Sequence, residues 1–495
     1  MGKKHSEISN DAELFVEGML RSAISWFEEW IVTLDCSSRF YKNEEYDKMD
    51  ELLEKQFRNY DSPKCDFDRL FIRLYDPIIQ QCKAHFRTHK KYSLRKMWDQ
   101  FKHLFGLLID RVKKLELILL PKVSEQLATK RNFKISIPGT YSVEHKVPTL
   151  YSIEPALQVL STQQHPRCVY MISSINEKVK FLLKGNEDIR LDQRVMQFFT
   201  LINSLLKHNR TTKEVNGMQI TKYAIIPLAP NAGLITWVTG ADTLHQMINE
   251  HRNLYHCSQS IELEIIMDIV GKSNQQLTTL QKLETFNYIK KKCKAYEIRE
   301  ILWLRSKNSF LWIKKNHNFT ITTALISMVG YIIGLGDRHP SNIMVQRETG
   351  KVIHIDFGDS FEAAILRKVF PEKVPFRLTR MIVNALDNGS VEGIFRKNCE
   401  DVMYVLRESK ESIVALLEIF VHEPIEEAER FGKEKLQTMI IDRVGEKLNG
   451  NDWMLPGYDE NNMELNVEEH VDKLIQQAMD PYRYVSHYAG WCPYW

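Results

Sequence analysis

The sequence lacks the signatures of secreted, metal-clustered and membrane-spanning proteins. Its eight cysteines are scattered and none forms a C-x-x-C pair, so neither a zinc cluster nor a disulfide framework is indicated. The first fifteen residues contain no apolar core of a secretory signal. The longest apolar stretch, residues 324–335, is too short to cross a bilayer and predicts a buried helix. A reducing, cytoplasmic location therefore fits best.

An excess of charge of one sign is also missing. The 67 Lys and Arg residues nearly balance the 64 Asp and Glu residues, which leaves a net charge of +3. This balance gives no reason to expect nucleic acid as a partner. The chain has 495 residues, of which 43% are hydrophobic and 26% charged, so we expect a globular protein of two or three domains.

The first quarter of the chain has helical periodicity. Residues 1–19 begin with a polar stretch and are predicted to be disordered. From Leu20 onward, apolar residues recur at intervals of three or four, and three further stretches of this kind follow before residue 118. Four amphipathic helices with short connections predict a four-helix bundle over residues 20–118.

The pattern changes after Pro121 to short apolar runs broken by turn residues, with one helical stretch among them. Residues 119–238 are therefore predicted to form a small lobe of strands and helix, and residues 239–430 a larger, mainly helical lobe. A linker with one amphipathic helix is expected over 431–463, and a short helical domain with an aromatic tail over 464–495. The fold class is thus α+β, with two lobes between helical modules.

Two motifs carry the chemistry. Asp337 and Asn342 lie five residues apart after an apolar helix, in GLGDRHPSN, and Asp356 ends a second apolar run, in HIDFG. A turn near residues 348–350 would fold this region as a hairpin and bring Asn342 and Asp356 together as hard oxygen ligands for Mg²⁺. Asp337 is left to align a hydroxyl and accept its proton, which is what phosphoryl transfer requires of a protein.

The order D-R-x-x-x-x-N resembles the phosphatidylinositol 3-kinase-related kinases and their lipid-kinase relatives. The stretches PEKVPFRLTRM (371–381), FLLKGNEDIR (181–190) and GWCPYW (490–495) are similar to the target-of-rapamycin kinases in particular. The resemblance runs from about Leu20 to the last residue. It implies a bilobal catalytic domain of the phosphatidylinositol 3- and 4-kinase type, between a rapamycin-binding bundle and a FATC domain. The implied activity is transfer of the γ-phosphate of ATP, with Mg²⁺ or Mn²⁺, to serine and threonine hydroxyls of proteins.

The resemblance also assigns roles to residues. Lys184 would contact the ATP phosphates and pair with an acid on the following helix, either Glu187 or Asp192. His339 would steady charge in the transition state. The phosphate-covering loop near Ser173 has no glycine, which leaves the affinity of that loop for nucleotide open. The implied adenine pocket consists of Leu183, Tyr223, Ile235, Trp237, Val238, Thr243, Met344 and Ile355.

Three readings of the function are open at this point. A phosphoinositide kinase usually places a basic cluster after the Asp-Phe-Gly motif, whereas this segment mixes Arg367, Lys368 and Lys373 with Glu362 and Glu372. A protein kinase is therefore favoured over a lipid kinase. A catalytically weak scaffold is the third reading, and only the glycine-free loop supports it.

The resemblance implies partners as well: protein substrates, the scaffold subunits of a TOR complex, and a small WD40 β-propeller subunit docked on residues 251–286. The same insert could instead be an internal helix of the large lobe. The aromatic tail could touch a membrane, which would place the protein peripherally on endomembranes. Binding of the rapamycin–immunophilin complex is not expected, because Lys42, Arg95 and Lys102 stand where the family has aromatic or threonine residues. Cys492 has no cysteine nearby in the tail, which disfavours a disulfide switch.

Overall fold

The computed structural model describes residues 2–87, 91–141, 147–162, 164–270, 277–363, 367, 370–421, 433–451 and 464–495. These residues form two compact units. The first unit comprises residues 1–193 and 223–237, and the second comprises residues 194–222 and 238–495. The expected small lobe, 119–238, differs from this division in residues 194–222 and 238. They belong to the second unit, where Arg194 donates a hydrogen bond to the Phe420 carbonyl and Phe199 packs edge-on against Phe357.

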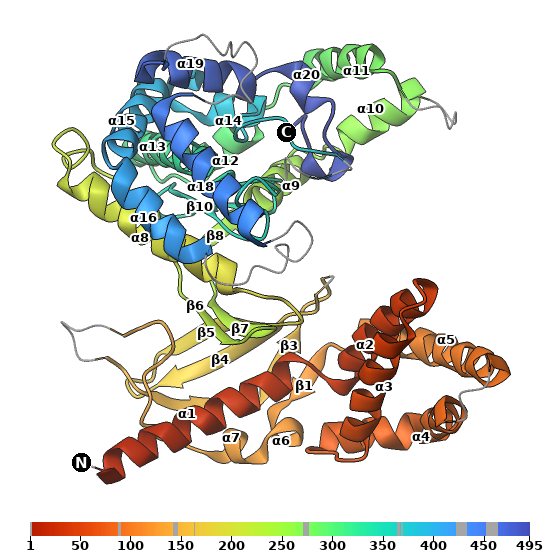
Figure 1. Ribbon diagram of the computed structural model, residues 1–495. Helices are drawn as coiled ribbons and strands as arrows, with labels where there is room; N and C mark the ends of the chain where they lie inside the picture. Colours follow the sequence, from red (N-terminus) through yellow and green to blue (C-terminus); the bar gives the residue numbers. More distant parts are fainter. Residues whose placement is uncertain are drawn as a thin grey trace. The chain divides into compact units, whose positions relative to one another are not determined.

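The first unit begins with a long helix, α1 (Gly2–Ala23), so the prediction of disorder over residues 1–19 is wrong. Phe15 and Met19 are buried against the unit's sheet, and this apolar anchoring orders a segment whose beginning is polar. Figure 1 shows α1 lying along strands of that sheet. The helix and the next one are separated at Ile24 and Ser25, which interrupts the continuous period predicted from Leu20.

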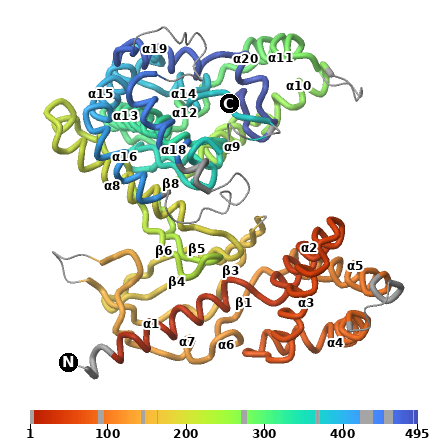
Figure 2. The backbone as a smooth tube through the Cα atoms, in the orientation of Figure 1, coloured from red at the N-terminus to blue at the C-terminus, as the bar shows by residue number. Residues whose placement is uncertain are grey.

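Four helices then form the bundle that the periodicity predicted (Figure 2). Each of them contributes aromatic side chains to one core, in which Trp30 and Phe71 stack and are fully buried. A buried ion pair between Glu28 and Arg167 joins the bundle to the sheet of the same unit. The helices are α2 (Trp26–Lys42), α3 (Tyr46–Tyr60), α4 (Asp66–Arg87) and α5 (Lys91–Lys113).

The sheet of the first unit has seven strands, in the order β1-β3-β4-β5-β7-β6 with β2 paired to β4. All these pairings are antiparallel. Short helices α6 (Leu120–Val123) and α7 (Glu125–Thr129) follow β1, and α8 (Arg190–His208) follows β5. The strands are β1 (Leu117–Leu119), β2 (Leu150–Ile153), β3 (Ala156–Val159), β4 (Arg167–Ser173), β5 (Lys178–Gly185), β6 (Ile225–Ala229) and β7 (Ala232–Thr236).

The second unit is mainly helical and is built around α13 (Ser309–Ile332), whose residues 318–332 are all buried. This confirms the buried helix predicted from the apolar stretch. A three-stranded sheet, β10-β9-β8, lies beside it: β8 (Ala241–Thr243), β9 (Ile343–Gln346) and β10 (Val352–His354). Among the described residues, no helix is long and apolar enough to span a bilayer. The remaining helices are α9 (Leu244–Leu254), α10 (Ile261–Val270), α11 (Thr279–Lys292), α12 (Glu297–Leu304), α14 (Arg380–Ala385), α15 (Ile394–Glu408), α16 (Lys410–Val421), α18 (Lys433–Asn449), α19 (Val467–Ala478) and α20 (Pro481–Tyr484).

Candidate active site

The hairpin of β9 and β10 has the form that the sequence predicted. Its strands pair antiparallel, with Val345 opposite Val352, and residues 347–349 form the turn. Asn342 precedes the hairpin and Asp356 follows it, so the hairpin returns the chain to its starting point. The Ile355 amide donates to the Asn342 carbonyl over 3.1 Å, which fixes the two motifs side by side.

Asp337 lies in the loop after α13 with its backbone held at both ends. Its φ is 54°, in the left-handed region that non-glycine residues seldom occupy. Its amide donates to Glu372 Oε1 over 2.8 Å, and its carbonyl accepts from Asn342 Nδ2 over 3.0 Å. Its side chain is 23% exposed. A strained conformation fixed by two hydrogen bonds is common at functional sites, and it sets the direction of the Cα–Cβ bond of Asp337.

Asn342 and Asp356 fit a divalent cation by their donor chemistry. Because Asn342 Nδ2 donates to the Asp337 carbonyl, its amide oxygen is left as the acceptor. Asp356 is exposed at the end of the hairpin, also with a positive φ, of 61°. Amide and carboxylate oxygens are the ligands that Mg²⁺ prefers, with the rest of its shell taken from phosphates and water.

Arg338 joins the two motifs, a role that the sequence analysis did not assign to it. It is 3% exposed, and its guanidinium donates to the carbonyls of Gly336, Ile355 and Asp356. His339 presents Nε2 at 3.9 Å from Asp337 Oδ2, while its Nδ1 accepts from the Ser341 amide. Burial lowers the pKa of His339, so the neutral ring that carries its proton on Nε2 is favoured.

In the first unit, Lys184 pairs with Glu187 over 2.9 Å. Glu187 precedes α8, which begins at Arg190, so this acid is not on the helix itself. Asp192 is in the helix and is buried at 4% exposure. Close approach of α1 requires the glycine after the lysine, because a Cβ at Gly185 would lie 2.2 Å from the Ala23 carbonyl oxygen.

The register of β5 corrects one expected pocket residue. Lys184 pairs with Gly233 and Leu182 with Ile235, whereas Leu183 pairs with Leu234. Side chains alternate between the two faces of a strand, so Leu183 points away from Lys184. It is fully buried in the core beneath the sheet. Leu182, which the sequence analysis missed, shares a face with Lys184 and Ile235; counting two residues back from Lys184 would have identified it.

The other expected adenine contacts lie in two groups, one in each unit. Tyr223 and Ile235 are half-buried in the first unit, where Lys180 Nζ lies 3.5 Å from the centre of the Trp237 ring. In the second unit, Thr243 and Met344 are register partners of β8 and β9. All four pocket residues of this unit, Val238, Thr243, Met344 and Ile355, are half-buried.

The loop between β4 and β5 forms a tight turn although it contains no glycine. Ser173 is 2% exposed and its Oγ accepts from the amides of Ile175 and Glu177. Asn176 supplies the left-handed position, with φ of 62°. In this arrangement Ser173 organises the turn, and the phosphate contact expected of it stays a prediction.

The aromatic tail packs inside the second unit. Trp491 is fully buried and Trp495 is 8% exposed, so neither side chain is available to a membrane in this structure. Arg377 donates to the carbonyls of Trp491 and Cys492 over 2.6 and 2.8 Å and lies 4.4 Å from the Trp491 ring. Cys492 is a free thiol, as expected.

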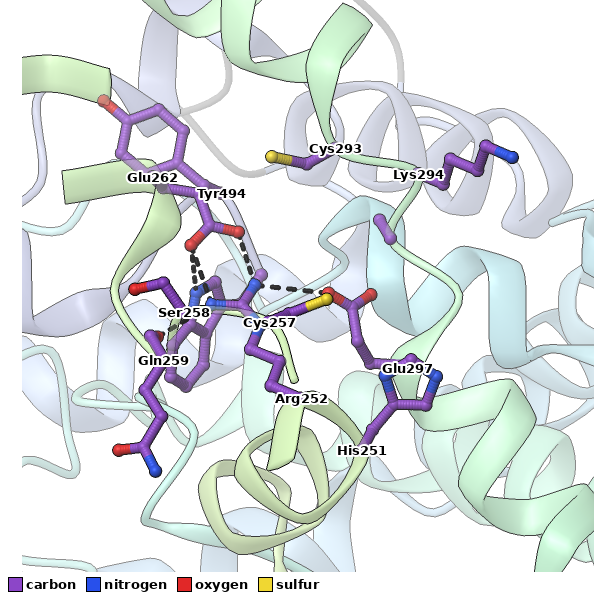
Figure 3. A network of polar contacts seen from close by, with 12 residues as sticks. His251, Arg252, Cys257, Ser258, Gln259, Glu262, Cys293, Lys294, Glu297 and Tyr494 are labelled. Atoms are coloured by element: carbon purple, nitrogen blue, oxygen red, sulfur yellow. Dashed lines mark hydrogen bonds and ion pairs between the residues drawn. The ribbon is translucent and has the colours of Figure 1, made fainter. Parts of the chain in front are cut away.

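Figure 3 shows a network of polar contacts that includes Arg252, Glu262 and Glu297. Glu262 Oε2 accepts from Trp495 Nε1 over 3.1 Å. The same carboxylate binds Arg252 in a bidentate ion pair, and Arg252 also reaches Glu297 over 3.2 Å. Arg252 and Glu262 are both 2% exposed. The network ties α9, α10 and α12 to the end of the chain.

Three family domains match the sequence in the order of these modules. The FKBP12-rapamycin binding domain matches residues 18–109, the phosphatidylinositol 3- and 4-kinase domain residues 178–430, and the FATC domain residues 464–495.

The relatives are protein kinases. The serine/threonine-protein kinase TOR of Arabidopsis thaliana is 34% identical over the whole of this chain, and TOR2 of Saccharomyces cerevisiae is 35% identical over 99% of it. The chain spans only 23% and 22% of those two proteins. The solved FAT and kinase domain of CtTel1 has the same fold over 93% of this chain and 36% of its own, with a TM-score of 0.60 and 24% identity. The chain therefore belongs to the phosphatidylinositol 3- and 4-kinase family, with the domain order of the C-terminal region of the target-of-rapamycin kinases.

Proposed function

We propose that the protein transfers the γ-phosphate of ATP to serine and threonine hydroxyls of protein substrates, with Mg²⁺ or Mn²⁺, in TOR-type growth signalling. The observation that carries the proposal is the hairpin that places Asn342 and Asp356 together, next to an Asp337 whose backbone is fixed at both ends. The three side chains supply two cation ligands and one proton acceptor.

Each side chain has one role in this reaction. Asn342 and Asp356 would hold the cation, which would neutralise phosphate charge. The substrate oxygen forms a bond to the γ-phosphorus as the bond from that phosphorus to the β,γ-bridging oxygen breaks. Asp337 accepts the proton of the substrate hydroxyl, and neutral His339 donates from Nε2 to developing charge. Lys184, held by Glu187, contacts the phosphates.

Ion pairing and burial of charged residues after the Asp-Phe-Gly motif favour a protein substrate over a phosphoinositide. Arg367 is paired with Asp359, and Glu362 is buried in an ion pair with Lys447. Glu372 is held against the Asp337 amide. Lys368 lies outside the described residues. Of the two cations described in this segment, Arg367 is paired and Lys373 is exposed, so an inositol phosphate would meet one exposed lysine and not a basic cluster. A weak scaffold is disfavoured because every metal and acid–base position is filled.

The insert 251–286 is proposed as the dock for a β-propeller subunit. Helix α10 is not an internal helix, since Leu263, Met267 and Ile269 are 41%, 69% and 48% exposed. Apolar exposure of this kind on one short helix is typical of a protein interface. Further scaffold subunits of a TOR complex are proposed on the evidence of the relatives. The eight free thiols favour a cytoplasmic location.

Two variants separate the proposed roles. Asp356→Ala should weaken Mg·ATP binding and abolish transfer, because it removes a cation ligand. Asp337→Ala should abolish transfer, by on the order of 10²-fold or more, and leave Mg·ATP binding close to that of the unmutated chain. Calorimetric titration with a non-hydrolysable ATP analogue and a peptide-phosphorylation assay measure the two effects. Turnover near the unmutated level in either variant contradicts the assignment.

A further inference from the structure

The side chain of the catalytic aspartate is contacted by the C-terminal tail. Tyr488 Oη donates to Asp337 Oδ1 over 3.0 Å, across 151 positions of sequence. The other carboxylate oxygen, Oδ2, faces His339 at 3.9 Å. The two oxygens therefore have different partners, and Oδ2 stays available to accept a hydrogen bond from the substrate hydroxyl.

We propose that Tyr488 is a positioning residue for phosphoryl transfer: its hydroxyl fixes the rotamer of Asp337 so that Oδ2 accepts the proton of the substrate hydroxyl. The backbone of Asp337 is already held by Glu372 and Asn342, but those bonds leave rotation about the Cα–Cβ and Cβ–Cγ bonds free. The Tyr488 hydrogen bond restricts that rotation. A proton acceptor must lie within hydrogen-bond reach of the proton it takes, so loss of orientation lowers turnover.

The tail is built to hold this hydroxyl in place. Tyr488 packs on a cluster that includes Phe286 and the buried Tyr484 and Trp491. A Cβ at Gly490 would lie 2.7 Å from the Tyr488 ring atom Cε2, so only glycine at this position leaves room for the observed ring position. Burial raises the pKa of Tyr488, and the Asp337 charge raises it further, so the phenol keeps its proton and stays a donor.

The tail in turn is fixed to the rest of the second unit at several points that follow Tyr488 in the sequence. Arg377 is buried and donates to three tail carbonyls, and Arg380 Nε donates to the Tyr494 carbonyl over 2.9 Å. The Trp495 indole donates to Glu262 over 3.1 Å. These contacts give the Tyr488 ring a rigid support, which a positioning residue requires.

This inference rests on the proposed function, and Tyr488→Phe tests it because the change removes only the hydroxyl. A hydrogen bond to a charged group contributes enough for its loss to cost about tenfold in kcat. The KM for ATP should stay unchanged, since Tyr488 contacts no nucleotide-binding residue proposed above. Tyr482→Phe is the matched control: Tyr482 is in the same tail and 55% exposed, and its loss of a hydroxyl should change nothing.

Gly490→Ala gives a second, independent route to the same effect, since it pushes the Tyr488 ring aside. If both act through one hydrogen bond, the double variant should lose no more kcat than the more affected single variant. Unchanged or increased kcat in Tyr488→Phe overturns the inference; an increase would mean that the hydroxyl competes with substrate. So would a loss of kcat in Tyr488→Phe that comes with an equal rise in the KM for ATP or with a loss of thermal stability. If Asp337→Ala is inactive while Tyr488→Phe is normal, the inference fails and the proposed function stands. If the unmutated chain phosphorylates no protein, the proposed function itself fails.

Discussion

Removal of Arg252 should destabilise the second unit more than removal of any exposed cation in it. The guanidinium is 2% exposed and binds two carboxylates, Glu262 over 2.5 and 2.9 Å and Glu297 over 3.2 Å (Figure 3). Arg252→Met preserves much of the side-chain volume but leaves the Glu262 charge buried with no opposite charge from this residue. Breaking a buried pair in this way costs about 3–5 kcal/mol.

The loss should be visible as a fall of about 5–10 °C in the melting temperature, measured by calorimetry. Lys397→Met is the control in the same unit: Lys397 pairs with Asp401 but is 67% exposed, so its removal should cost less than about 1 kcal/mol. The double variant Arg252→Met with Glu262→Gln should recover part of the loss, because the unpaired buried charge is gone. Equal melting temperatures for Arg252→Met and the control would refute this reasoning, as would a double variant less stable than the single one.

Three further outcomes are expected. Met267→Asp with Ile269→Asp should abolish co-purification with a β-propeller subunit. Because both side chains are exposed, the change should leave thermal stability unchanged. Retained binding would exclude α10 as the dock. The rapamycin–immunophilin complex should bind this chain at least about 10³-fold more weakly than a variant with aromatic residues in place of the cations of its helical bundle. Those cations, Lys42, Arg95 and Lys102, are exposed, and Tyr41 packs on Trp98. Nanomolar affinity in a titration would contradict this prediction. Burial raises the pKa of Glu372 to about 7, above its unfolded value near 4.5. Between pH 4.5 and 7, this carboxyl is therefore protonated in the folded state and ionised in the unfolded state. The free energy of unfolding should therefore fall by up to about 3 kcal/mol as pH rises from 4.5 to 7, and Glu372→Gln should flatten that dependence; a steeper slope in the variant would contradict the shift.

The sequence predicted best where a local pattern determines the structure. The helical periods gave the four-helix bundle, and the two apolar runs with a turn between them gave the hairpin that brings Asn342 to Asp356. The order of strands and helices gave the α+β class. Each of these depends on contacts between segments that are close in sequence or on a repeat that is visible in it.

The sequence did not predict contacts between distant segments, nor on which face of a strand each side chain lies. Tyr488 reaches Asp337 across 151 positions, and Glu372 reaches it across 35, so no spacing rule connects them. Leu183 was assigned to the adenine pocket one residue out of phase, because similarity to a motif does not specify on which face of a strand each side chain lies. Helix α1 was missed because its order comes from burial of Phe15 and Met19 against the sheet, which a polar beginning conceals.

The central claim is tested most directly by phosphate transfer from radiolabelled ATP with Mg²⁺, offered in parallel to serine- and threonine-containing peptides and to phosphatidylinositol vesicles. The assay uses the purified chain and its Asp337→Ala variant. Label on peptide hydroxyls with the unmutated chain, lost in the variant and absent from lipid, is the predicted result. Label on lipid instead of peptide, or equal peptide labelling by the variant, would contradict the account.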